Sequence, residues 1–491
     1  MSDLTNCATT FLRYPYGTSL KKENMSDLTN DATTFLRYPN GTSLKKEEEK
    51  KSDLSARHKP CGHIHPTNHV HGTYVIFLSS PEFLVDVIDP ALQEWGHQLN
   101  DLWKFLGRKI SGNVAQEPEK YSQIYVSHPV VVPGGRFRES IDLLEKEFQF
   151  WEKQRSVNVT DSKGKTHTVA QYRVEVSEPR PESFSEDYKL AENLTTEDAK
   201  QQLYVELKSG AESGWDYSTR WIVNNDTNEG TLKDLKVTSI APVDLNSLLC
   251  MNARILSEFY KKAGNYSKEK YYEDLANSKN NTMAELFWDN TDGTWHDYDI
   301  TKQKKRRYFY LSNIHPLWSD CYGKEGSRAH TVENVIKYLK SMKVLDHIGG
   351  VPTSLEKSGQ QWDYPNAWAP LQHIAILGLY NARSIHHEAE SLSFSLAEKW
   401  IRTTWLGYQQ STPHAMFEKY NVEIMGLPGG GGEYDVQLGF GWTNGVAMHL
   451  LDIYGDRLTA ARGGSTSFKA PSWFSFVSLM LIPFLYQTLS W

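Results

Sequence analysis

A helical spacing of apolar side chains, which recurs along most of the chain from Asp89 onward, constrains the fold more than any other feature. Six apolar residues after Asp89 follow one another at intervals of three and four, which places them on one face of a helix. They are Leu92, Trp95, Leu99, Leu102, Trp103 and Leu106. Similar stripes occupy residues 141–151, 245–260, 332–342, 367–380, 392–405 and 437–454. Long amphipathic helices joined by aromatic and glycine-rich loops predict an all-α fold with its function on the loops.

The net charge and the aromatic content of the chain indicate which kind of molecule it could bind. The 491 residues carry a formal charge of -7, so no broad basic surface suggests a nucleic-acid partner. Fifteen Trp and 26 Tyr could stack on the apolar faces of sugar rings, although large helical cores also use aromatic residues. A neutral small-molecule substrate fits this composition better than a polyanion.

The N-terminal 80 residues read as an extension. Residues 1–23 recur as residues 25–47 with two changes, and the arm has neither the apolar centre nor the cleavage site of a signal peptide. We expect residues 1–80 to be a disordered arm. The histidine-rich stretch 58–71 could gather imidazoles around a metal, but a flexible segment lacks the preset geometry of a site. We therefore predict no metal and no other cofactor.

The C-terminal region, residues 457–491, reads as a linker followed by a hydrophobic tail. Residues 473–486 are apolar apart from two serines, and small residues stand ahead of them at 463–465. The tail could be a glycosylphosphatidylinositol signal, a membrane helix or a sequence foreign to the rest of the chain. The first two imply membrane association and an extracellular or cell-surface glycoprotein. Asn-x-Ser/Thr acceptors begin at Asn24, Asn40, Asn158, Asn193, Asn225, Asn265 and Asn280.

The cysteines carry little information. Four widely spaced cysteines are too few for a disulfide framework, and Cys250 lies in an apolar helical run where we expect a core side chain. On this interpretation cysteine usage does not indicate a redox compartment.

Three aromatic loops contain the candidate chemistry. Asp216 stands between Trp215 and Tyr217, where burial would raise its pKa and keep it protonated as an acid. Glu418 precedes four consecutive glycines at 429–432, which favour a mobile or sharply turned loop over a site. The segment 360–372 is rich in Trp, Asn and Gln and opens a helix. Two carboxylates in such loops suit glycoside cleavage by a general acid and a general base.

Longer motifs make the pattern specific. Residues 361–366 (QWDYPN) with 368–370 (WAP), and residues 133–139 (PGGRFRE), resemble the two signatures of trehalases, glycoside hydrolase family 37. The glycine run that ends in Glu433 and Tyr434 is also similar to that family. The resemblance covers residues 81–456 and implies an (α/α)6 barrel with a sugar site at one mouth. It also implies inverting hydrolysis of α,α-trehalose to two glucose molecules.

The resemblance assigns roles to individual residues. It implies that Asp216 is the general acid and Glu418 the general base. The positions that match the family's sugar-binding residues are Arg136, Arg180, Pro181, Glu182, Gly214 and Glu433.

The sequence departs from the family pattern after Glu139. Ser140 passes directly into residues 141–145, which resemble a later helix, so a block of barrel helices is expected to be absent. Its neighbours would expose faces meant to be buried and the sugar would lose partners, so we expect impaired activity. The alternatives are a catalytically impaired sugar-binding or membrane-tethered protein, and another (α/α) barrel carbohydrase.

Overall fold

The computed structural model describes residues 82–111, 137–323 and 325–460. Most of the ordered elements are helices, so the all-α fold class is confirmed. The α-helices are α3 (Pro90–Ser111), α5 (Phe137–Gln154), α6 (Phe184–Ala191), α7 (Glu197–Glu212), α8 (Val243–Lys262), α9 (Tyr266–Thr282), α10 (His315–Ser319), α11 (Arg328–Ser341), α12 (Ala369–Asn381), α13 (His387–Gln410) and α14 (Gly441–Tyr454).

Short strands and single helical turns connect these helices. The strands are β1 (Ser156–Thr160), β2 (Thr166–Ala170), β3 (Ile240–Ala241), β4 (Trp288–Asp289), β5 (Thr294–Trp295), β6 (Tyr298–Asp299), β7 (Lys304–Lys305), β8 (Asn366–Trp368) and β9 (Lys419–Asn421). All pairings are antiparallel: β1 with β2, β3 with β6, β6 with β7, β4 with β5, and β8 with β9. The single turns are η1 (Glu82–Asp86), η2 (Pro181–Ser183), η3 (Thr219–Trp221), η4 (Leu232–Asp234), η5 (Val237–Ser239), η6 (Met283–Phe287), η7 (Leu311–Ile314), η8 (Glu325–Ser327) and η9 (Ala382–Ser384).

Each predicted amphipathic stripe coincides with a helix, and two of the predicted starts are corrected. The stripe predicted from residue 367 begins as a helix at Ala369, because residues 366–368 pair with β9 and Pro370 occupies the first turn of α12. The stripe predicted from residue 437 begins as a helix at Gly441, because Phe440 before it is extended. In both places the residues lost from the helix belong to loops around the candidate site.

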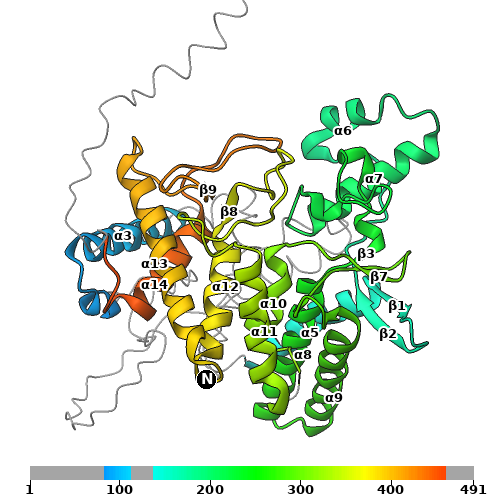
Figure 1. The fold of residues 1–491 in the computed structure, drawn as a ribbon, viewed down its shortest axis with the longest axis horizontal. Coiled ribbons are helices and arrows are strands. Elements are labelled where there is room, and N and C mark those ends of the chain that lie inside the picture. Colours follow the sequence, from blue (N-terminus) through cyan, green and yellow to red (C-terminus); the bar gives the residue numbers. More distant parts are fainter. Residues whose placement is uncertain (1–81, 112–136, 324, 461–491) are drawn as a thin grey trace, which may run out of the picture.

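The helices pack in sequence-adjacent pairs around a common core. α8 lies along α9, and α12 lies along α13; α10 packs against α8 and α12, while α14 packs against α12, α13 and α3. Figure 1 shows the loops that carry β8 and β9 at the upper end of α12 and α13, with α6 and α7 beyond them. This arrangement is of the (α/α)6 type, with the site-bearing loops at one end of the bundle.

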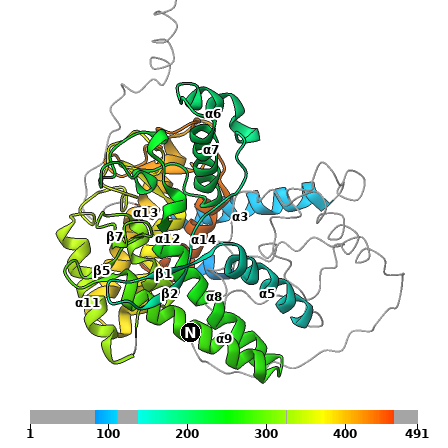
Figure 2. The ribbon, with the colours of Figure 1, turned by 90° about the vertical axis from the view of Figure 1, so that its right-hand side faces the viewer.

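Among the described residues, the two helices nearest the predicted gap pack on different neighbours. α3 packs on α14, and α5 packs on α8, but the described elements include no extensive contact between α3 and α5. Figure 2 shows these two helices standing apart on the same side of the molecule. Glu139, after which a block of helices is predicted to be absent, lies in the first turn of α5.

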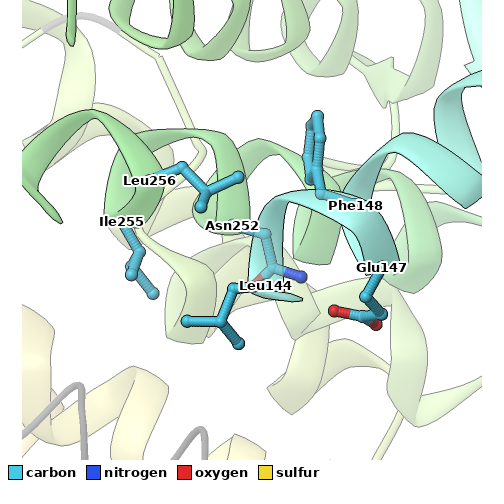
Figure 3. Close-up of a pocket in the computed structure, with 6 residues that line it drawn as sticks. All are labelled: Leu144, Glu147, Phe148, Asn252, Ile255 and Leu256. Atoms are coloured by element: carbon cyan, nitrogen blue, oxygen red, sulfur yellow. The ribbon is translucent and has the colours of Figure 1, made fainter. Parts of the chain in front are cut away.

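A small pocket lies on the seam between α5 and α8 (Figure 3). Its lining is mostly hydrophobic, with one carboxylate and one amide among the apolar side chains, and none of these residues was predicted to bind sugar. They are Leu144, Glu147, Phe148, Asn252, Ile255 and Leu256. The pocket therefore shares no residue with the candidate site.

Cys250 corrects the prediction made for the cysteines. Its side chain is buried in α8, as expected for a core residue, but it forms a disulfide with Cys321, which follows α10. The sequence prediction missed this pair because 71 positions separate the two residues and only the packing of α10 on α8 brings them together.

Several predictions fall outside the described residues. These are the disordered N-terminal arm, the histidine-rich stretch 58–71, the hydrophobic tail and Arg136. Over residues 82–111, 137–323 and 325–460, no helix has the length and apolar character needed to cross a bilayer. Within the same ranges no group of His, Cys, Asp and Glu side chains is arranged to hold a metal ion.

Candidate active site

The loop after α7 presents Asp216. Gly214 has a φ of 65°, a left-handed conformation that glycine adopts without strain and that turns the chain out of the helix. Further along the loop, the buried Arg220 guanidinium lies 4.4 Å from the ring centroid of Trp215 and 4.5 Å from that of Trp221. Arg220 is also paired with two carboxylates, Asp244 and Asp297. The residues that flank Asp216 are therefore held on a rigid base.

A second buried carboxylate joins this loop to the segment 354–363. Asp363 accepts hydrogen bonds from the Ser218 hydroxyl at 2.7 Å and from the Thr219 backbone N–H at 2.8 Å. It also accepts from the hydroxyl groups of Ser354 and Ser358. Because Asp363 is fully buried with its oxygens occupied in this way, its role is to hold the two loops together.

Asp216 itself lies in a setting that favours the protonated acid. Its pKa is raised to about 7, chiefly by burial and also by the negative charges of Glu433 and Glu418, while the Arg180 guanidinium opposes the rise. The Gln361 side-chain amide donates to the Asp216 backbone carbonyl and lies 3.5 Å from Asp216 Oδ2. Arg180, Glu433 and Glu418 therefore lie close enough to Asp216 for their charges to act on its carboxyl group.

Glu418 immediately precedes β9 and is fully buried. Its Oε1 accepts a hydrogen bond of 2.9 Å from the Tyr434 hydroxyl, and its backbone is fixed by Gln437 and Trp442. Burial raises the pKa of Glu418, and the Tyr434 hydrogen bond and the Lys419 charge oppose that rise. Glu418 is thus a carboxylate whose ionised form has specific support, as a general base requires.

The four-glycine loop is clamped rather than free. The Asn366 amide donates to the Gly430 carbonyl at 2.8 Å and accepts from the Gly430 N–H at 3.0 Å. A Cβ atom on Gly429 would lie 2.5 Å from Asn366 Oδ1, and one on Gly431 would lie 2.4 Å from the Gly359 carbonyl oxygen. The loop is therefore sharply turned, and close approach of neighbouring atoms excludes a side chain at Gly429 and Gly431.

Arg180 connects this loop to the region before α6. Its guanidinium forms a paired interaction with Asp187, with Nη2 to Oδ1 at 2.7 Å and Nε to Oδ2 at 3.0 Å. The same group donates to both carboxylate oxygens of Glu433, at 3.1 and 3.3 Å. Arg180 is 3% exposed, whereas the Glu433 side chain keeps 24% exposure, so Glu433 can still contact a ligand.

Four tryptophans from the loops of the candidate site pack against one another. Trp362 stacks on Trp368 with ring centroids 3.8 Å apart, Trp215 lies 5.3 Å from Trp362, and Trp442 meets Trp368 edge to face at 5.7 Å. These rings join the acid loop, the segment 360–372 and the start of α14. Trp215, Trp362 and Trp368 are buried, so the rings form a packed base that holds these loops together.

Most of the predicted site residues that the structure describes converge on one place. Asp216, Glu418, Arg180 and Glu433 interact with one another, and Gly214 shapes the acid loop. Pro181 and Glu182 form η2 directly after Arg180, and both are exposed. Glu182 has no hydrogen bond or ion pair within the described part of the chain, so its contact with a sugar remains a prediction.

Four residues of the site were not among the predicted site residues. Asp187 holds Arg180, and Gln361, Lys419 and Tyr434 contact the carboxylates or each other. Gln361, Lys419 and Tyr434 lie inside the aromatic motifs, which was a usable signal for them. Asp187 had no such signal, because its pairing with Arg180 depends on the turn at η2.

Comparison with known proteins identifies the family. A family model described as Trehalase matches residues 28–142 and 138–455. The trehalase of Apis mellifera is 39% identical over 455 aligned positions, which cover 77% of this chain and 72% of that protein. The trehalase of Homo sapiens is 38% identical, covering 80% of this chain and 78% of that protein. The solved neutral trehalase of Saccharomyces cerevisiae is 20% identical with a TM-score of 0.47, covering 65% of this chain and 59% of that one.

The alignments also bear on the predicted gap and on the start of the similarity. The two matched segments meet at residues 138–142, beside the predicted junction after Glu139. Since 455 aligned positions exceed 77% of 491 residues, the Apis mellifera protein has residues at positions where this chain has none. The match starts at residue 28, within the arm predicted to extend to residue 80. On the extent and identity of these matches, the chain belongs to the trehalase family of glycoside hydrolases.

Proposed function

We propose that this chain hydrolyses α,α-trehalose to two glucose molecules with inversion, using Asp216 as general acid and Glu418 as general base. The placement of Asp216 and Glu418 in one site, each in a different electrostatic setting, supports the proposal most directly. Asp216 has its pKa raised to about 7 by burial, whereas Glu418 accepts a hydrogen bond from Tyr434. In such a site the acid protonates the bridging oxygen while the base activates a water on the opposite face of the sugar.

In this proposal the ion pair of Arg180 and Glu433 binds the sugar. The fixed guanidinium and the partly exposed carboxylate can both hydrogen-bond ring hydroxyls, and their mutual contact fixes their spacing. Neither reaction step requires a metal or an organic cofactor.

The anomeric form of the first glucose tests the mechanism. Inversion at one carbon of α,α-trehalose releases one β-glucose and leaves one α-glucose, so proton NMR in the first minutes should detect both in equal amounts. Release of α-glucose alone would indicate retention and would exclude the role given to Glu418. The Asp216→Asn and Glu418→Gln variants are the matched controls, and each should release no glucose above the uncatalysed rate. Maltose and cellobiose, tested alongside, distinguish a carbohydrase with another preference.

A second candidate function is sugar binding without turnover, and the residues of the Apis mellifera protein that this chain lacks favour it. Missing helices would remove partners of the sugar while leaving the four tryptophans in place. Quenching of tryptophan fluorescence by trehalose, with no glucose release from the same sample, would support this alternative. Turnover comparable to that of a full-length trehalase would contradict it.

We also propose an extracellular or cell-surface location, with attachment to a membrane through residues 473–486 as an expectation from sequence. The Cys250–Cys321 disulfide supports an oxidising environment, and the exposed Asn158, Asn193 and Asn225 support use of their glycosylation acceptors. Expression in animal cells tests both parts. The protein should lose mass on treatment with an amidase that removes N-linked glycans, and a phospholipase that cleaves lipid anchors should release it from cells.

A further inference from the structure

Lys419 carries a buried cation in the middle of the site. Its residue is fully buried on β9, next to Glu418, and its ammonium donates to the Gly431 carbonyl at 3.2 Å and to Gln361 Oε1 at 3.4 Å. The ammonium also lies 5.1 Å from the ring centroid of Trp368. No ion pair joins it to a carboxylate within the described residues. A charge buried in this way is costly unless its field acts on nearby anions.

Gln361 connects Lys419 to the proposed acid, Asp216. The oxygen of its side-chain amide accepts from Lys419, while the nitrogen donates to the Asp216 backbone carbonyl and approaches Asp216 Oδ2. The Gln361 backbone carbonyl is itself held by the side chains of Asn366 and Trp368. Gln361 therefore has a fixed orientation and joins the loop that carries Asp216 to Lys419 on β9.

Tyr434 connects Lys419 to the proposed base, Glu418. The Lys419 ammonium lies 5.6 Å from the centroid of the Tyr434 ring, and the Tyr434 hydroxyl donates to Glu418 Oε1 at 2.9 Å. A cation beside an aromatic ring is favourable in a desolvated site. The contacts thus run from Asp216 through Gln361, Lys419 and Tyr434 to Glu418.

We propose that Lys419 is a positioning residue that keeps the Glu418 carboxylate ionised by its charge and fixes the Asp216 loop against β9 through Gln361. The proposal deepens the function proposed above and rests on it for the roles of the two carboxylates. The ionisable groups that act on Lys419 are Glu418 and Asp216, and those that act on Glu418 are Lys419 and Tyr434. Lys419 is therefore the cation that stabilises the charged form of Glu418 against burial.

A double-mutant cycle in thermal stability tests the electrostatic part without requiring turnover. The four proteins are the parent, Lys419→Met, Glu418→Gln and the double variant, with Tm measured between pH 5 and pH 8. Without the cation the pKa of Glu418 should rise by about one unit or more. Its ionisation then costs stability, so the Tm deficit of Lys419→Met should grow as the pH rises. In the Glu418→Gln background the pH dependence of this deficit should shrink to the part that comes from Asp216, the other carboxylate that acts on Lys419.

Two further variants keep the test specific. Lys419→Arg retains the charge and should behave like the parent in its pH dependence. Lys399→Met removes another largely buried lysine, one that donates to the Leu345 carbonyl away from the site, and should give a pH-independent change. An equal Tm loss at every pH for Lys419→Met in both backgrounds would overturn the proposal and leave Lys419 a packing residue.

Kinetics test the link through Gln361. The Gln361→Met variant keeps the side-chain size but breaks both contacts, so kcat should fall about tenfold or more while KM changes little. In Lys419→Met the acidic limb of the pH profile should move to higher pH by about one unit. If the parent releases no glucose, the proposed function fails while the stability cycle still decides the role of Lys419. An unchanged kcat in Gln361→Met, with an active parent, would remove Gln361 from the proposal.

Discussion

Arg180 Nη2 lies 3.1 Å from Glu433 Oε1, although 253 positions separate the two residues in the sequence. The other side of the Arg180 guanidinium is occupied by Asp187, so the arginine links the start of α6 to the glycine-rich loop. Arg180 is thus a single buried cation that two carboxylates share at the candidate site. Removing either anion has a different expected consequence, because only Glu433 remains partly exposed.

Asp187→Asn should destabilise the protein. The substitution keeps the shape of the side chain but leaves the buried Arg180 without its main counter-charge, which typically costs about 3–5 kcal/mol. Urea unfolding monitored by circular dichroism measures the change. Glu197→Gln is the control: its partner Lys200 is 3.9 Å away on the surface, and the change should stay under about 1 kcal/mol. Equal effects of the two variants would contradict a structural role for the Asp187 pair.

Gly429→Ala should impair activity, whereas Gly430→Ala should not. Neither glycine has a positive φ, so the two substitutions differ only in the space around the new methyl group. At Gly429 the methyl would meet Asn366 Oδ1 at 2.5 Å and Lys419 Cγ at 2.9 Å, while at Gly430 nothing lies within 4 Å. The displaced loop should lower kcat/KM for trehalose about tenfold or more. Glucose release from both variants gives the comparison, and similar rates would show that the clamp at Asn366 is unimportant for the reaction.

The pH profile should fall on its alkaline side near neutrality. An acid catalyst must be protonated, and burial raises the pKa of Asp216 to about 7, so kcat/KM should drop about tenfold per pH unit above that value. Glu433→Gln removes a negative charge that raises this pKa, so the alkaline limb should move to lower pH whatever the variant's overall rate. Steady-state kinetics between pH 5 and pH 9 measure the limb. A limb that stays in place in Glu433→Gln would argue against Asp216 as the titrating acid.

A buried histidine pair should make the fold sensitive to acid. His373 Nε2 and His449 Nδ1, on α12 and α14, lie 2.7 Å apart. Burial lowers the pKa of His449 to about 4 and lowers that of His373 well below its usual value, to which the His449 charge also contributes. The unfolded chain binds these protons near pH 6.5, so this stability is present above pH 6.5 and is lost as the pH falls toward 4.

Replacing both histidines by leucine isolates this contribution. The parent should lose up to about 1.4 kcal/mol per pH unit for each histidine between pH 6.5 and pH 4, and the variant should show a correspondingly flatter dependence. Denaturant unfolding at several pH values measures the slopes. His330→Gln, at an exposed position of α11, should keep the parent's slope. Parallel slopes in the parent and the double variant would contradict the assignment.

Loss of the Cys250–Cys321 disulfide should lower stability by about 2–4 kcal/mol, since the bond closes a loop with a sequence separation of 71. Cys250→Ser with Cys321→Ser should therefore lower the Tm, and a reducing agent should lower the parent's Tm but leave the variant unchanged. Peptide mapping without reduction should recover the linked pair in the parent. A Tm that does not respond to reduction, with the linked peptide absent, would show that both thiols are free.

Local sequence determined a large part of this protein. The spacing of apolar residues predicted α3, α5, α8, α11, α12, α13 and α14, because a helix places residues three and four apart on one face whatever surrounds it. Long motifs likewise indicated the loops that carry Asp216 and Glu418.

Tertiary structure alone decided which distant groups meet. Asp187 and Glu433 share Arg180, Cys250 pairs with Cys321, and Lys419 reaches Asp216 through Gln361, and no spacing in the chain indicates any of these contacts. The β8–β9 pairing also shortened the predicted α12, because backbone hydrogen bonds across the site prevailed over local helical periodicity. Helical periodicity arises between neighbours in the chain, whereas electrostatic pairing and burial depend on positions in space, and the pKa values that define an acid and a base depend on them too.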